Sequence, residues 1–97
     1  MYEVLLHPDV QKVYVNADKI LAKKIARCLQ QLEQTPQSHP NIKALKGDYA
    51  GYYRYRIGDY RVLYSVDGEL VQVFVVAIAH RSEVMNPRDD RAGLAAN

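Results

Sequence analysis

The chain has 97 residues, the size of one domain built around one hydrophobic core. Hydrophobic residues make up 48% of the sequence and charged residues 25%, values that exclude a disordered chain. The net charge of +2 is too small to identify a nucleic-acid-binding protein by itself.

Three absences narrow the class of protein further. The longest purely apolar run, Val73 to Ala79, has seven residues, whereas a membrane-spanning helix needs about 20. No basic stretch precedes an apolar one at the N-terminus, so no secretory signal is visible. The single cysteine, Cys28, excludes an internal disulfide and a cysteine-based zinc site. We therefore expect a protein of the reducing cytoplasm with no membrane partner.

The first half of the chain predicts a strand and two helices. Residues 2–6 have the composition of a short strand, and Pro8 suits the first position of a helix that ends near Val15. Asp18 is a candidate N-cap of a second helix, which should end near Gln34 because a proline follows two residues later. The apolar stripe of this helix consists of Leu21, Ile25, Cys28 and Leu32, with Ile20 and Leu29 beside them.

A polar loop at 35–46 precedes a predicted three-stranded antiparallel meander, because the hydrophobic period changes to two after Gly51. Gly-Asp and Asp-Gly turns separate its strands, at residues 52–57, 60–66 and 69–79. The predicted fold class is α+β, with two N-terminal helices packed on one face of a small, mainly antiparallel four-stranded sheet (β-α-α-β-β-β). We expect residues 1–97 to form a single domain, with a core at about 2–85 and a polar C-terminal tail at 86–97.

Two-residue turns would determine which side chains share a face of the meander. In the first hairpin Arg56 then faces Arg61 and Arg54 faces Leu63, and in the second hairpin Arg61 faces Phe74. The face predicted to pack on the helices holds Tyr55, Ile57, Tyr60, Val62, Tyr64, Val66, Val71, Val73 and Val75. The other face holds Arg54, Arg56, Arg61, Leu63, Ser65, Gln72, Phe74, Val76, Ile78 and His80.

Three arginines thus meet on one face, although like charges directly opposite each other destabilise a sheet. Solvent and carboxylates such as Asp48 or Glu83 offer one explanation. A binding site for an anion is the other, with phosphate favoured because planar guanidinium groups offer paired donors to its oxygens. RNA fits better than a small phosphate compound, because the sequence has no glycine-rich phosphate loop. Nearby rings could stack on bases: Tyr49, Tyr52 and Tyr53, the last also a candidate core residue.

His80 is the histidine that this register places beside the arginines, and imidazole is a common proton-transfer group near neutral pH. A surface or capping role is the alternative. We expect His7 and His39 to be structural, and Cys28 to be a small core residue. The sequence contains no metal-binding motif and no paired carboxylates on one face, so neither a metal nor a cofactor is expected.

Four segments of the sequence carry a family resemblance: LKG at 45–47, YRYRIGDYRVLY at 53–64, VFVVAI at 73–78 and HRSEV at 80–84. At this spacing they resemble the RelE/ParE toxin superfamily, on the RelE side. The resemblance covers about residues 2–85 and agrees with the predicted order of helices and strands. It implies a small bacterial toxin of a toxin–antitoxin pair that cleaves mRNA in the ribosomal A site and so arrests translation.

The resemblance also implies the chemistry and the partners. A ribose 2′-OH would attack its own 3′ phosphate without a metal or cofactor. The implied partners are a cognate antitoxin (RelB-like or other), the 70S ribosome and mRNA. The implied catalytic residues are Arg54, Arg56, Arg61, His80 and Arg81, and the RNA-binding residues are Lys46, Tyr53, Arg54 and Arg56.

Among these residues, Arg61 would stabilise the transition state. Arg54 and Arg56 would hold the phosphate backbone, at positions where a lysine could act as a base but an arginine cannot easily do so. One of His80 and Arg81 would serve in proton transfer.

Met85 departs from the family pattern, because many relatives have a tyrosine there that helps to organise the reaction. A thioether cannot supply a useful proton. Two other functions therefore stay open, a ParE-like inhibitor of DNA gyrase and a catalytically weak member that binds its antitoxin. The retained basic residues disfavour gyrase inhibition, since a gyrase binder needs no site for a pentavalent phosphorus, whereas Met85 favours the weak member.

Overall fold

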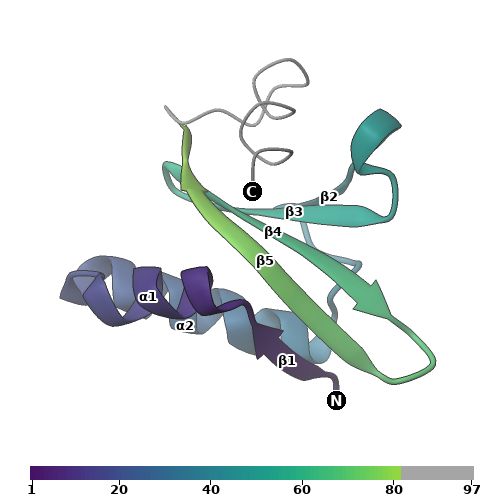
Figure 1. Cartoon of the computed structure of the whole chain (residues 1–97), viewed down its shortest axis with the longest axis horizontal. Coiled ribbons are helices and arrows are strands. Elements are labelled where there is room, and N and C mark those ends of the chain that lie inside the picture. The colour runs from purple at the N-terminus through teal and green to yellow at the C-terminus, as the bar shows by residue number, and fades with distance from the viewer. Residues whose placement is uncertain (82–97) are drawn as a thin grey trace.

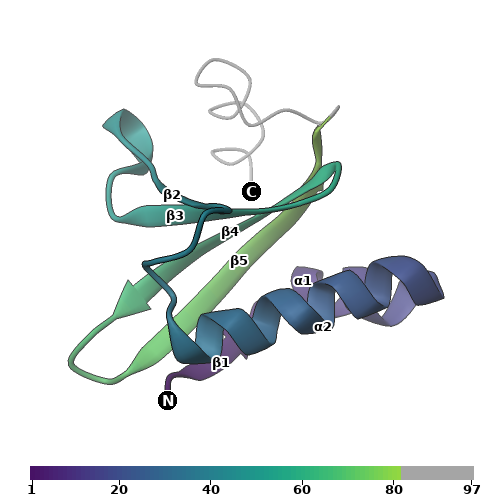
Figure 2. The same cartoon turned by 180° about the vertical axis from the view of Figure 1, so that it is seen from behind.

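The computed structural model describes residues 1–81, so Met85 and the predicted tail lie outside the described part of the chain. Its elements are β1 (Glu3–Leu6), α1 (Pro8–Asn16), α2 (Lys19–Gln34), β2 (Ile42–Ala44), the short 3₁₀ helix η1 (Gly47–Tyr49), β3 (Tyr52–Ile57), β4 (Tyr60–Asp67) and β5 (Gln72–His80). Both α-helices lie against the same face of one sheet (Figure 1), and the view from behind shows the same arrangement (Figure 2). The predicted α+β class is confirmed.

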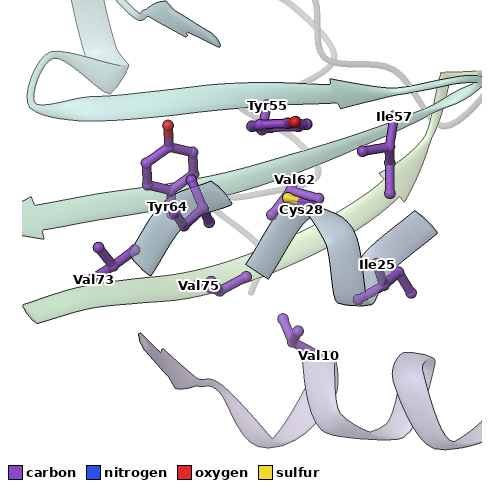
Figure 3. Packing of buried hydrophobic residues seen from close by; sticks show 10 residues of the cluster. Val10, Ile25, Cys28, Tyr55, Ile57, Val62, Tyr64, Val73 and Val75 are labelled. Atoms are coloured by element: carbon purple, nitrogen blue, oxygen red, sulfur yellow. The ribbon is translucent and has the colours of Figure 1, made fainter. Parts of the chain in front are cut away.

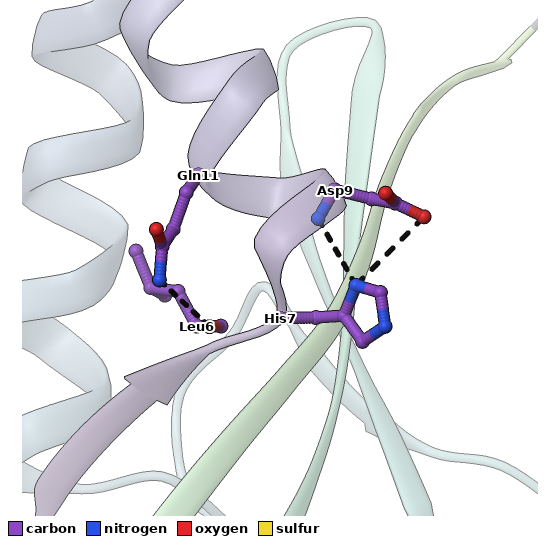
Figure 4. Close-up of polar contacts among 4 residues, drawn as sticks. All are labelled: Leu6, His7, Asp9 and Gln11. Carbon is purple, nitrogen blue, oxygen red and sulfur yellow. Dashed lines mark hydrogen bonds and ion pairs between the residues drawn. The ribbon is translucent and has the colours of Figure 1, made fainter.

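Side chains beside each helix start bind the backbone N–H groups that have no partner within the helix. At α1, His7 Nδ1 accepts the Asp9 N–H at 3.0 Å (Figure 4). Gln11, within the helix, holds the preceding strand instead, because its Nε2 donates to the Leu6 carbonyl at 3.2 Å. At α2, an Asp18 carboxylate oxygen accepts the Leu21 N–H at 2.8 Å. The predicted N-cap of the second helix and the structural role of His7 are confirmed. Within residues 1–81 no helix is long and apolar enough to cross a membrane.

The sheet has five strands in the order β1-β5-β4-β3-β2, rather than the four that the sequence predicted. The additional strand is β2, which lies inside the segment expected to be a loop and pairs antiparallel with β3. Three residues are too few to show a period of two, so this edge strand has no pattern of its own in the sequence. The first strand, β1, pairs parallel with β5, which makes β5 an interior strand between β1 and β4.

The core lies between α2 and the helix-facing side of β3, β4 and β5 (Figure 3). On α2, the side chains of Ile25, Cys28 and Leu32 are buried, as the predicted stripe requires. Ile20, predicted beside that stripe, is instead 70% exposed. At the centre of the sheet, the buried Tyr64 hydroxyl donates to the Pro36 carbonyl at 2.6 Å, which satisfies a polar group that burial would otherwise penalise.

The second hairpin differs from the predicted two-residue turn. Asp67 pairs with Gln72, so four residues rather than two connect β4 to β5. One Asp67 carboxylate oxygen accepts the N–H groups of Glu69 and Leu70, both at 3.0 Å. An aspartate that binds the next N–H groups in this way stabilises a local turn of its own, and the loop becomes longer.

A β-bulge interrupts the pairing of β4 with β5. Tyr64 pairs with Val75, but Leu63 pairs with Ala77, which leaves Val76 without an opposite residue. One extra residue moves every later side chain of its strand to the other face. The residues of β5 after Val76 therefore lie on the opposite faces from those that the sequence predicted.

Val71 is the one non-glycine residue with a positive φ among residues 1–81, at 54°. A β-branched residue in this left-handed region costs about 1–3 kcal/mol. Val71→Gly should remove that cost, and the greater flexibility of glycine in the unfolded chain offsets part of the gain. We expect a free energy of unfolding higher by about 1 kcal/mol, measured by urea denaturation. The same substitution at Val15, an exposed position of α1, should instead lower stability, and equal losses at both positions would contradict the strain.

Candidate active site

The predicted arginine cluster forms on the sheet face turned away from the α-helices. In the pairing of β3 with β4, Arg54 lies across from Leu63 and Arg56 across from Arg61, as the two-residue Gly58-Asp59 turn predicted. Residues directly opposite each other in a sheet share a face. Leu63 is 1% exposed and lies opposite Arg54 and two residues from Arg61 on β4, so the arginines adjoin a buried apolar side chain. We call this surface, with Arg54, Arg56 and Arg61, the arginine face.

The arginines interact electrostatically, and Arg54 experiences the strongest effect. Burial lowers the pKa of the Arg54 guanidinium, and the positive charges of Arg61 and Arg56 lower it further. The Arg54 Nε atom is buried and has no hydrogen-bond partner within residues 1–81. A buried donor without a partner costs free energy.

Neither ion pair within residues 1–81 neutralises the arginine face. One joins His7 to Asp9 at 3.8 Å, and the other joins Arg81 to Asp59 at 3.7 Å. Asp48, a candidate to absorb the positive charge, is in neither pair, and Glu83 lies outside the described residues. In this part of the chain the cluster keeps its net positive charge.

Arg81 lies at the turn end of the arginine face. Its N–H donates to the Asp59 carbonyl at 2.6 Å, and its Nε is 3.7 Å from an Asp59 carboxylate oxygen. Both side chains are largely exposed, so this ion pair is weak and can exchange for a ligand. Arg81 comes two residues after Ala79, which pairs with Arg61 on the arginine face.

His80 lies on the other face of the sheet, and its predicted position beside Arg61 is wrong. It pairs with Tyr60, and the two rings make an edge-to-face contact with centroids 5.1 Å apart. Tyr60 packs against the helix-side core. The physical reason is the unpaired Val76, which shifts the alternation of β5 by one residue before it reaches His80.

Tyr53 is also on the helix-facing side, so the prediction that it binds RNA beside the arginines is not supported by its position. Its ring stacks on Tyr64 at 5.6 Å, and its hydroxyl accepts a hydrogen bond from Gln37 Nε2 at 2.8 Å. The alternative reading, a core residue, fits these contacts. Tyr52, one residue earlier, pairs with Ser65 and therefore lies on the arginine face.

Two lysines precede β3. The predicted Lys46 is exposed at the start of η1. Lys43 was not predicted, because its segment was expected to be a loop, yet it lies on β2 directly across from Arg54. The alternation of Ile42, Lys43 and Ala44 was the available signal, and it is too short to distinguish a strand from a loop.

The remaining candidates are structural, as expected. Burial raises the pKa of the Cys28 thiol to about 12, so it stays protonated and unreactive. The His39 ring stacks on Tyr55 at 5.2 Å, and His39 Nδ1 accepts the Asn41 N–H at 3.0 Å. Within residues 1–81 no group of three or more His, Cys, Asp or Glu side chains is arranged to hold a metal ion.

A family model for the ParE toxin of type II toxin–antitoxin systems (parDE) matches residues 4–85. The chain belongs to the RelE/ParE toxin superfamily. It is therefore a toxin of a type II toxin–antitoxin system. No curated protein matches the sequence.

Solved structures agree with this assignment of the toxin. The archaeal RelE–RelB complex from Pyrococcus horikoshii is similar at 27% identity and a TM-score of 0.74, over 86% of this chain and 98% of that chain. The RelBE2 toxin–antitoxin complex from Mycobacterium tuberculosis is similar at 27% identity and a TM-score of 0.69, over 82% and 98%. The isolated RelE toxin from E. coli has the same fold, at 17% identity and a TM-score of 0.70, over 99% and 98%.

Proposed function

We propose that this toxin is a metal-independent endoribonuclease that cleaves mRNA in the A site of the 70S ribosome, in the cytoplasm. The observation that carries the proposal is the set of three arginines with no neutralising ion pair within residues 1–81. Such a set has no benefit for folding, because the like charges repel each other. It suits a substrate that develops negative charge on a phosphate.

In the proposed reaction, the ribose 2′-OH loses its proton to solvent and its oxygen attacks the adjacent 3′ phosphorus, while the bond from that phosphorus to the 5′ oxygen of the next nucleotide breaks and a 2′,3′-cyclic phosphate forms. Negative charge accumulates on the phosphate oxygens in the transition state. Arg61 lies directly opposite Arg56 on the arginine face and is proposed to bind these oxygens. Arg54 and Arg56 would hold the same phosphate and its neighbours through their guanidinium groups.

Proton transfer to the leaving 5′ oxygen is proposed to involve Arg81 rather than His80. Of this pair, only Arg81 lies at the arginine face, and its exposed contact with Asp59 can open. A guanidinium that binds the departing oxygen stabilises its charge while solvent delivers the proton. Lys46, exposed before β3, would contact RNA or the ribosome.

The natural partner is proposed to be a cognate antitoxin, RelB-like or of another family. Support comes from similar structures that contain an antitoxin, including the RelE–RelB complex of P. horikoshii and a YoeB–YefM complex of Staphylococcus aureus. An antitoxin bound over the arginine face would block the entry of RNA.

Primer extension on mRNA from cells that briefly express the toxin tests this function. We expect cuts inside translated reading frames and none in a matched transcript whose start codon has been removed, because the ribosome presents the substrate. Cuts in both transcripts would contradict dependence on the ribosome. Growth arrest with cuts in neither would exclude the endoribonuclease.

A second candidate function is inhibition of DNA gyrase, which the match to the ParE toxin family model favours. Under this alternative the purified toxin should inhibit supercoiling by gyrase and leave cellular mRNA intact. The arginine face disfavours it, since binding to gyrase requires no site for phosphate chemistry.

A further inference from the structure

We propose that Lys43 on β2 is a fourth cation of the substrate site and binds the phosphate next to the one held by the arginines. This inference rests on the proposed function, because it takes single-stranded RNA as the ligand. It adds a contact that depends on β2, the strand that the sequence did not reveal.

The position of Lys43 follows from the pairing of the sheet. Lys43 lies directly across from Arg54, which lies directly across from Leu63, so the three residues form one row on the arginine face. Neighbouring strands are about 4.8 Å apart, and residues two apart on a strand are separated by about 6.7 Å. The backbone of Lys43 is therefore adjacent to that of Arg54 but more than about 10 Å from that of Arg61, which is two strands and one row away. With a phosphate centred on Arg61, this offset favours the neighbouring phosphate as the ligand of Lys43.

The charge of Lys43 also supports a role in binding phosphate. Lys43 is exposed, forms no ion pair within residues 1–81 and has a cation directly opposite, an arrangement that destabilises an antiparallel pair. The Lys43–Arg54 and Arg56–Arg61 pairs make two adjacent rows of positive charge from β2 to β4. A chain of phosphates can contact both ends of this surface at once. A lysine suits the outer position, because its hydrated ammonium binds phosphate as a point charge in solvent.

The competing explanation is that Lys43 only protects the edge of the sheet. The strand β2 is an outer strand, and lysine on such a strand discourages pairing with another chain. The two explanations differ in what happens to RNA binding when the charge is removed, so a binding measurement decides between them.

The test uses the full-length toxin and a short single-stranded RNA with 2′-O-methyl riboses, which cannot be cleaved by 2′-OH attack. Its affinity is measured over a range of salt concentrations. Each phosphate contact contributes about 0.7 to the slope of log affinity against log salt for single strands. Lys43→Ala should reduce this slope by about 0.7, and Lys43→Arg should retain it. The matched control is Lys23→Ala. Lys23 is an exposed lysine of α2, which covers the opposite side of the sheet from the arginine face, so its removal should leave the slope unchanged.

A second comparison tests whether Lys43 and Arg61 bind different phosphates. Lys43→Ala should reduce the slope by the same amount in wild-type and Arg61→Ala backgrounds, because contacts to separate phosphates are independent. The inference is overturned if Lys43→Ala, like Lys23→Ala, leaves the slope unchanged, or if it causes only self-association. It is also overturned if the effect of Lys43→Ala on the slope vanishes in the Arg61→Ala background, or if the wild-type toxin does not bind the RNA. Intact mRNA in the primer-extension experiment would refute the endoribonuclease but leave the slope measurement to decide the role of Lys43.

Discussion

Arg61→Ala should reduce the rate of mRNA cleavage by about 100- to 1,000-fold, the usual effect of removing one preorganised donor from a developing oxyanion. Arg61 is the residue directly opposite Arg56, and its charge also acts on Arg54. Its removal therefore takes away a positive charge that acts on both of the other arginines of the arginine face. The measurement is the cleavage rate of a message on purified ribosomes, with growth arrest as the cellular readout.

The same variant should be at least as stable as the wild-type toxin. Removing one of two like charges that face each other in a sheet relieves about 0.2–1 kcal/mol of repulsion. A variant that loses activity while its free energy of unfolding is maintained has lost a functional group rather than its fold. Arg27→Ala, at an exposed position of α2, is the matched control and should retain full cleavage. Full activity of Arg61→Ala would remove Arg61 from the reaction.

The largest effect on stability is expected for Ile25→Ala, with a loss of about 2–5 kcal/mol in the free energy of unfolding. Ile25 is 0% exposed and belongs to the cluster between α2 and the sheet. The substitution removes apolar contacts and leaves a cavity that close-packed neighbours fill only in part. A loss of this size is a large fraction of the 5–15 kcal/mol typical of a small domain. Urea denaturation measures it.

Ile20→Ala supplies the matched comparison on the same helix. Ile20 is 70% exposed, so the same chemical change should alter stability by less than about 0.5 kcal/mol. Two isoleucines five residues apart would then differ several-fold in their contribution to the free energy of unfolding. Equal losses at the two positions would contradict the burial of α2 described above.

The contrast between the two hairpins explains how much of the site the sequence could predict. In the first hairpin, the Gly58-Asp59 turn determines the register, and the predicted pairs Arg56–Arg61 and Arg54–Leu63 are both confirmed. Gly58 supports this turn with a φ of +60°, a conformation that glycine adopts at little cost. The three arginines could therefore be placed on one face from alternation alone.

In the second hairpin, two local features made the predicted register of β4 and β5 wrong. The carboxylate of Asp67 binds two N–H groups and lengthens the turn, and Val76 has no partner on β4. The composition of the strand is apolar on both sides of Val76, so its hydrophobic pattern contains no sign of the bulge. The change in face moved His80 away from the arginines, and a similar absence of pattern concealed β2 and with it Lys43.

The position of β5 in the sheet determines when the toxin can complete its fold during synthesis. The strand is the last described element to leave the ribosome, yet it separates β1 from β4 and pairs with both. Until it is made, β1 has no neighbour in the sheet, and the buried side chains of α2 lack the Val73 and Val75 surface that covers them. Contacts between residues so distant in sequence form slowly and late. A nascent toxin thus remains unable to close its core until nearly all of the described chain has been translated.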